Sequence, residues 1–129
     1  MSAGTRGSAA EIRTIREFEK QGYWCVRAAG SHGVADLVAL KPRQALLIQV
    51  KRTHHPDPEM SDLISGSEFN AVFEAARMSG GTPVLAAWTG GAGPKSARLH
   101  LLRITGLHVE YSKFWPVQEL VLDELAATA

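Results

Sequence analysis

Three polar side chains lie on two short apolar segments that a turn joins. Asp36 lies on the segment 35–40, and Gln49 and Lys51 lie on or just after the segment 45–50. If the two segments pair as an antiparallel hairpin, Asp36 falls directly opposite Gln49. Gln49 and Lys51 share one face because side chains alternate along a strand. We therefore expect one polar cluster at the open end of the hairpin.

Such a cluster contains the groups that a metal-dependent phosphodiesterase requires. Carboxylate and amide oxygens suit Mg²⁺ or Mn²⁺, and a bound cation polarises a phosphate and activates water. A nearby lysine stabilises the negative charge that develops on the phosphate. The spacing alone also permits a purely structural arrangement, in which Asp36 and Lys51 form an ion pair on an edge strand and Gln49 faces solvent.

The first half of the chain predicts the elements that flank this hairpin. Apolar residues at helical spacing indicate a helix over about 9–21, and Ser8 followed by Glu11 has the pattern of a capping box. An aromatic and β-branched segment predicts a strand over 23–28, which ends at the glycine-containing loop 30–33. A turn of four residues, 41–44, is expected to join the hairpin strands.

The second half adds elements that complete a sheet. We expect a loop over 53–66, then a helix over 68–79 that Ser67 caps, because its apolar residues recur at helical spacing. Strands are expected over 83–88 and 98–104. The final element is predicted to be an amphipathic helix that begins at Trp115-Pro116 and turns Val117, Leu120, Val121 and Leu125 inward. This order predicts an α/β fold with helices packed on a mixed sheet.

Length and composition limit the class of protein. A chain of 129 residues that is 45% hydrophobic can bury one core, so we expect a single domain over residues 1–129. The apolar segments are far shorter than a membrane span, and the first residues do not form an apolar signal segment. A lone cysteine, Cys25, fits a reducing compartment. We therefore expect a cytoplasmic protein without membrane contact.

Charge is distributed unevenly, although the net charge is only +1. Residues 1–55 contain nine Lys or Arg and four Asp or Glu, a net charge of +5, whereas residues 56–129 have a net charge of −4. A basic half provides the kind of surface that binds the phosphates of nucleic acid. A chance fluctuation on a solvated surface would give the same numbers.

The polar cluster and its flanking segments resemble one nuclease family. The stretches that carry this resemblance are Arg6-Gly7-Ser8 with Glu11, Val26-Arg27-Ala28-Ala29-Gly30-Ser31-His32-Gly33 with Asp36-Leu37-Val38-Ala39, and Leu47-Ile48-Gln49-Val50-Lys51-Arg52. Over residues 6–52 the chain is similar to the archaeal-type Holliday junction resolvases of the PD-(D/E)XK nuclease superfamily. The resemblance implies a restriction-endonuclease-like core of three layers, with a mixed sheet between helices.

The resemblance also implies roles for individual residues. Glu11, Asp36 and Gln49 would bind Mg²⁺ or Mn²⁺, with Lys51 beside the scissile phosphate and Ser31 near the cleavage site. The residues expected to contact DNA are Arg6, Arg27, His32 and Arg52. Members of the family are homodimers that cut a four-way DNA junction symmetrically and need no organic cofactor, so we expect the same here. The aromatic residues Phe114-Trp115, near the expected last helix, are one candidate for the dimer interface.

Gln49 departs from the family pattern, which has glutamate at this position. An amide oxygen can bind a hard cation, but without charge it holds the cation less strongly. Two alternatives to a junction resolvase therefore stay open. One is a nuclease of the same fold that cuts other branched or duplex DNA. The other is a junction-binding protein that the change at Gln49 has made inactive.

Overall fold

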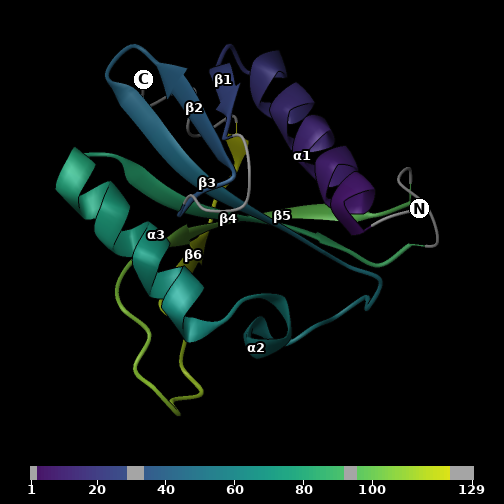
Figure 1. Ribbon diagram of the computed structural model, residues 1–129, viewed down its shortest axis with the longest axis vertical. Helices are drawn as coiled ribbons and strands as arrows, with labels where there is room; N and C mark the ends of the chain where they lie inside the picture. The colour runs from purple at the N-terminus through teal and green to yellow at the C-terminus, as the bar shows by residue number, and fades with distance from the viewer. Residues whose placement is uncertain (1–2, 29–33, 92–95, 123–129) are drawn as a thin grey trace.

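A six-stranded mixed sheet with helices on both faces forms the molecule (Figure 1). The computed structural model describes residues 3–28, 34–91 and 96–122, with side chains from residue 9 onward. Its elements are α1 (Ala3–Lys20), β1 (Trp24–Arg27), β2 (Leu37–Lys41), β3 (Gln44–Thr53), α2 (Met60–Leu63), α3 (Gly66–Ser79), β4 (Thr82–Thr89), β5 (Arg98–Ile104) and β6 (Val117–Glu119). No helix in the described ranges is long and apolar enough to cross a membrane.

The strands lie in chain order from β1 to β6, and neighbouring strands are antiparallel except β3 and β4. This one parallel pair is possible because α3 makes the crossover between the two strands. Helix α1 packs against β1, β2 and β3, and α3 packs against β3 and β4 from the other side of the sheet (Figure 1). The predicted α/β class and its three layers are confirmed.

Each face of the sheet has its own apolar core. Phe18 of α1, Ile48 and Trp88 belong to the first core, and all three are buried. Phe69 of α3 and Leu85 belong to the second core. The two cores arise because successive side chains on β3 and β4 point to opposite faces. The strands between them are therefore fixed in position from both sides.

The hairpin of β2 and β3 has the predicted register over most of its length. Val38 pairs with Leu47 and Leu40 pairs with Ala45, as expected from the sequence. The turn is shorter than expected: Lys41 and Gln44 still pair, so only residues 42–43 form the turn, and Arg43 takes a positive φ of 65°. The pairing stops at Leu37 and Ile48, so the predicted direct pair of Asp36 and Gln49 is not formed.

Helix starts differ from the sequence prediction. Helix α1 begins at Ala3, so Ser8 lies inside it, and the predicted capping box of Ser8 and Glu11 is wrong. Helix α3 is capped by Ser65 rather than Ser67, because the Ser65 side chain accepts a hydrogen bond from the Glu68 N–H. Serine is a preferred cap residue at either position, but only Ser65 is followed three residues later by a glutamate.

Two segments have a secondary structure that differs from the sequence prediction. The expected loop over 53–66 contains the end of β3 and the short helix α2. The expected C-terminal helix is wrong over Val117–Glu119, which form strand β6 and pair with Leu102–Ile104 of β5. An open edge of β5 offers unpaired backbone groups, and pairing with them outweighs a modest helical pattern. Leu125 of that predicted helix lies outside the described residues.

A buried hydrogen bond joins α1 to β4. Thr14 is fully buried, and its hydroxyl donates to the Ala10 carbonyl at 2.8 Å and accepts from the Trp88 indole N–H at 2.9 Å. The Arg13 guanidinium lies 4.2 Å from the centre of the same indole ring, on its outer side. The Thr14 hydroxyl thus provides the hydrogen-bond acceptor for the buried indole N–H of Trp88.

Replacing Thr14 by valine should therefore destabilise the protein, because the Trp88 N–H would lose its partner inside the core. We expect Thr14→Val to lower the free energy of unfolding by about 1–3 kcal/mol, measured by urea denaturation. Thr14→Ser keeps the hydroxyl and is the matched control, with a smaller loss. Equal stability of Thr14→Val and wild type would show that this bond is unimportant.

Candidate active site

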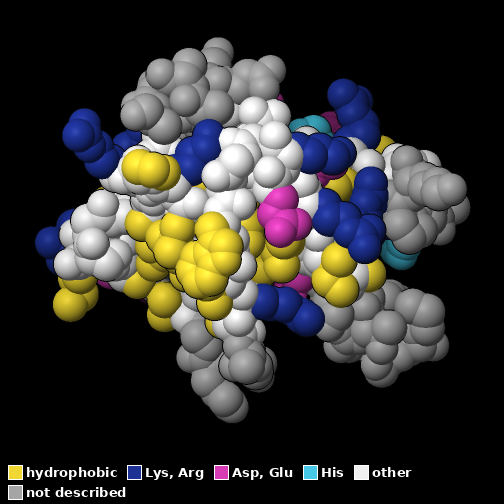
Figure 2. Space-filling model, turned by 90° about the horizontal axis from the view of Figure 1, so that it is seen from above, with side chains coloured by type: hydrophobic (Ala, Val, Ile, Leu, Met, Phe, Trp, Pro, Cys, Tyr) yellow, Lys and Arg dark blue, Asp and Glu magenta, His cyan; other side chains and the backbone are white. Residues whose placement is uncertain are grey.

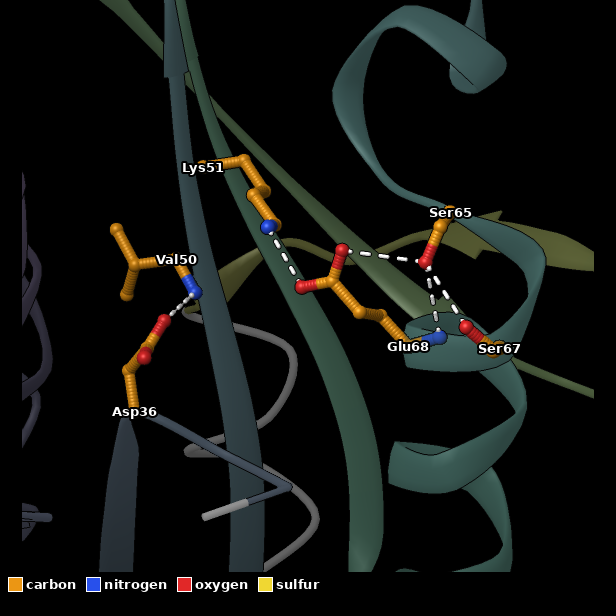
Figure 3. A network of polar contacts seen from close by, with 6 residues as sticks. All are labelled: Asp36, Val50, Lys51, Ser65, Ser67 and Glu68. Atoms are coloured by element: carbon orange, nitrogen blue, oxygen red, sulfur yellow. Dashed lines mark hydrogen bonds and ion pairs between the residues drawn. The ribbon is translucent and has the colours of Figure 1, made fainter. Parts of the chain in front are cut away.

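Asp36 lies directly before β2, at the open end of the hairpin, and its backbone and side chain both bond to neighbouring segments. Its N–H donates to the Ile48 carbonyl and its carbonyl accepts from Ala28 N–H, both at 2.9 Å. The carboxylate oxygen Oδ2 accepts a hydrogen bond from the Val50 N–H at 2.8 Å (Figure 3). The carboxylate is therefore fixed against the β3 backbone, between α1 and α3.

Lys51 extends from β3 toward the first turn of α3. Its Nζ donates to Oε2 of Glu68 at 2.8 Å (Figure 3). The other carboxylate oxygen, Oε1, accepts a hydrogen bond from Ser65 Oγ at 3.2 Å. The structural alternative raised by the sequence, an ion pair between Asp36 and Lys51, is thus replaced by an ion pair with Glu68.

Glu68 is the residue of this site that sequence reasoning missed. It stands 17 positions after Lys51 on a different element, so no strand or helix period connects the two. The available signal was weak: an acidic residue three positions after a serine, at the beginning of a helix. The sequence predicts Ser67 as the cap, and with that cap Glu68 has no special position.

Gln49 lies between these groups on β3. Its side chain is only 9% exposed, and it faces the same side of the sheet as Lys51. Its amide makes no hydrogen bond to another residue in the described part of the chain. No buried side-chain nitrogen or oxygen of the described residues lacks a partner, so the Gln49 amide keeps some contact with solvent and is available to an additional group at the site.

Glu11 and Arg27 meet at the α1 side of the site. The Arg27 Nε donates to Oε2 of Glu11 at 2.5 Å, which links α1 to the end of β1. The Glu11 side chain is 18% exposed and that of Arg27 is 41% exposed. The structure therefore places two residues of the predicted site in direct contact, at the end of β1.

Electrostatic effects connect the three carboxylates. Burial raises the pKa of Asp36 above its ordinary value, and the charges of Glu11 and Glu68 raise it further. The Val50 N–H and Lys51 act in the opposite direction. The hydrogen bond from Lys51 lowers the pKa of Glu68. Asp36 is thus a carboxylate whose negative charge is incompletely compensated by the protein itself.

The oxygen donors at this site suit a hard divalent cation. No group of three or more His, Cys, Asp or Glu side chains that could hold a metal occurs among the residues that the structure describes. Mg²⁺ in substrate-bound sites uses only one or two carboxylates, and waters and phosphate oxygens complete its shell. Asp36 and the free Gln49 amide fit that requirement, and they do not form a closed site made of protein ligands alone.

The remaining predicted site residues have different environments. Arg52 Nη1 donates to the backbone carbonyls of Thr53 at 3.1 Å and Gly90 at 3.0 Å, so it connects the ends of β3 and β4. Ser31 and His32 lie outside the described residues. Arg6 lies in α1, in the part of that helix whose side chains are not described.

Asp36→Asn should stabilise the metal-free protein at neutral pH. Folding raises the pKa of Asp36, so the folded state binds this proton more tightly than the unfolded state, and ionised Asp36 disfavours folding. Asparagine can still accept the Val50 N–H bond. We expect a higher Tm for Asp36→Asn in EDTA at pH 7, and a difference that shrinks as the pH falls toward 4. A lower Tm at pH 7 would contradict this account.

The sequence and the fold are both similar to known proteins. The chain matches the family model of the archaeal Holliday junction resolvases (Hjc) over residues 2–120. Its fold is similar to the solved structure of Archaeoglobus fulgidus Hjc, a Holliday junction resolvase from an archaeal hyperthermophile, with a TM-score of 0.69 at 20% sequence identity. That similarity covers 93% of this chain and 99% of the other. Because the family model covers nearly the whole sequence, this chain belongs to the archaeal Holliday junction resolvase family.

Proposed function

We propose that this protein is a divalent-cation-dependent endonuclease that resolves four-way DNA junctions by paired, symmetric phosphodiester hydrolysis. The observation that carries the proposal is the position of Asp36 and Lys51, which lie at one end of β2 and β3 together with the largely buried residue Gln49. Family membership supports junction DNA as the substrate. The ion, Mg²⁺ or Mn²⁺, is part of the proposal.

Each residue of the site has a role that follows from its chemistry. Asp36 and Gln49 present oxygens to the cation, and Glu11 adds negative charge from α1. When bound, the cation supplies Lewis acidity toward the phosphate and a more acidic water. The Lys51 ammonium stabilises the charge that develops on the phosphate oxygens.

DNA contacts are proposed for the basic residues of the first half of the chain. Arg27 is 41% exposed beside Glu11, which holds its guanidinium in one orientation. Arg6 and His32 are proposed to contact DNA as well, and Ser31 to act near the cleavage site, because the family resemblance implies these roles. Arg52 keeps a proposed DNA contact, although its guanidinium already binds two backbone carbonyls.

We propose a homodimer because one face of the sheet is apolar and is only partly covered by the residues that the structure describes. On the side of α3, the paired strands β1 and β2 place Trp24 beside Leu40 and Val26 beside Val38. Trp24 is 67% exposed and Val26 is 41% exposed, while α3 packs farther along the sheet, on β3 and β4. Figure 2 shows apolar side chains gathered on the upper face of the molecule, with Lys and Arg side chains around them. A second copy would bury such a face.

One specific observation favours a second candidate function, a junction-binding protein without activity: position 49 carries an uncharged amide. A protein of this kind would bind a four-way junction tightly and leave it intact with any divalent cation. A nuclease for other branched or duplex DNA is distinguished from these two candidates by competition binding. Such a nuclease would bind a linear duplex of equal length as tightly as the junction.

Cleavage of a labelled, immobile four-way junction tests the proposal. Wild type should make paired nicks with Mg²⁺ or Mn²⁺, none in EDTA, and none in the matched duplex. Lys51→Ala and Asp36→Asn should cut about 100-fold more slowly or not at all, with junction binding kept. Lys41→Ala, at the other end of the same hairpin, is the control and should cut at the wild-type rate. Undiminished cleavage by Lys51→Ala would refute the assigned roles.

The proposed dimer face is tested by Trp24→Glu, which places a charge on it. We expect this variant to be monomeric in analytical ultracentrifugation and to nick junctions without pairing the two cuts. Phe114→Glu alters an exposed side chain after β5, where the sequence suggested another interface. It should leave the dimer intact, and the reverse pattern would assign the interface to that segment.

A further inference from the structure

Position 49 on β3 lacks the negative charge that the family pattern has there, and a carboxylate on α3 lies at the site instead. Residue 49 is glutamine, so the strand that carries Lys51 has no carboxylate two residues before it. The Lys51 ammonium nevertheless contacts a carboxylate at 2.8 Å, and that carboxylate belongs to Glu68 on α3. The lysine side chain is 25% exposed, so this contact is partly shielded from water.

Glu68 is held in place on both sides of its carboxylate. Oε2 contacts Lys51, and Oε1 accepts a hydrogen bond from Ser65 Oγ at 3.2 Å. The same Ser65 hydroxyl accepts the Glu68 N–H at 3.1 Å (Figure 3). A carboxylate in the first turn of a helix is also stabilised by the helix dipole. The group is therefore preorganised before any DNA binds.

A second acidic residue of α3 shows what an ordinary surface ion pair looks like in this protein. Glu74 pairs with Arg77 three residues later on the same helix, so this ion pair joins no second element. Glu68 instead joins two elements, α3 and β3, at the site that contains Asp36 and Gln49. Its partner is the lysine proposed to act on the phosphate, so its position has a consequence beyond the stability of α3.

We propose that Glu68 supplies from α3 the negative charge that Gln49 lacks, and that it positions the Lys51 ammonium for the phosphate. The inference rests on the proposed nuclease function and adds a residue to it. A carboxylate at either position would then serve the site, because position 49 lies on the same face of β3 as Lys51 and Glu68 contacts Lys51 from α3. The two positions should therefore substitute for one another.

A double-mutant cycle tests this exchange. We expect Glu68→Gln to lower the single-turnover cleavage rate at saturating junction about 100-fold, with the Kd for the junction unchanged. Adding Gln49→Glu to Glu68→Gln should recover most of that loss. The same Gln49→Glu change should raise the rate far less in the wild-type background, because the two effects are coupled. Glu74→Gln is the matched control on α3 and should behave as wild type.

A second readout does not depend on cleavage. Amine-reactive labelling of Lys51, followed by mass spectrometry of the free protein, reports whether its ammonium is held. Labelling should be faster in Glu68→Gln and slow again in the double variant. The Tm of each variant confirms folding.

Three results would overturn the inference: wild-type cleavage by Glu68→Gln, equal gains from Gln49→Glu in both backgrounds, or a loss in Glu68→Gln that the second change does not recover. If wild type itself does not cut, the proposed function fails. The labelling series then decides separately whether a carboxylate at position 49 can replace Glu68 beside Lys51.

Discussion

The alternation of side chains along β3 is the constraint on which the rest of the structure depends. Leu46, Ile48 and Val50 pack into the core beneath α1, so the residues between them must face α3. On that face Leu47 belongs to the second core, and Gln49 and Lys51 follow it toward the end of the strand. Strand β3 thus contributes side chains to both cores, and its polar residues Gln49 and Lys51 lie just beyond the second core. A shift of one residue would bury Lys51 beneath α1 and expose Ile48.

The site combines this rigid strand with a carboxylate that folding does not favour. The regular pairing of β2 and β3 stops at Asp36, whose Oδ2 accepts a hydrogen bond from the Val50 N–H. Burial and two neighbouring carboxylates disfavour its ionised form. Such a group is tolerated when the surrounding fold is stable and when a cationic ligand compensates the charge. The two cores provide the stability that this arrangement requires.

The sequence predicted those features that depend on local pattern. The hairpin register followed from alternation, and the helices and central strands followed from their apolar periods, so the sequence correctly placed Asp36 beside the strand that carries Gln49 and Lys51. It failed where distant segments decide the outcome. Strand β6 forms because β5 has an open edge, and Glu68 reaches Lys51 because α3 begins beside β3. No repeating pattern of residues in the sequence indicates either contact.

The crossover from β3 through α3 to β4 has a consequence for the order of folding. The β2–β3 hairpin closes over a two-residue turn, a local event with a small entropic cost. The parallel pairing of Gln49 with Leu85 must close a loop of more than thirty residues, which is slow by comparison. Because Glu68 lies on the crossover helix, Lys51 acquires its partner only when α3 docks against β3. Incomplete chains that have made the hairpin would therefore hold the lysine without the carboxylate that orients it.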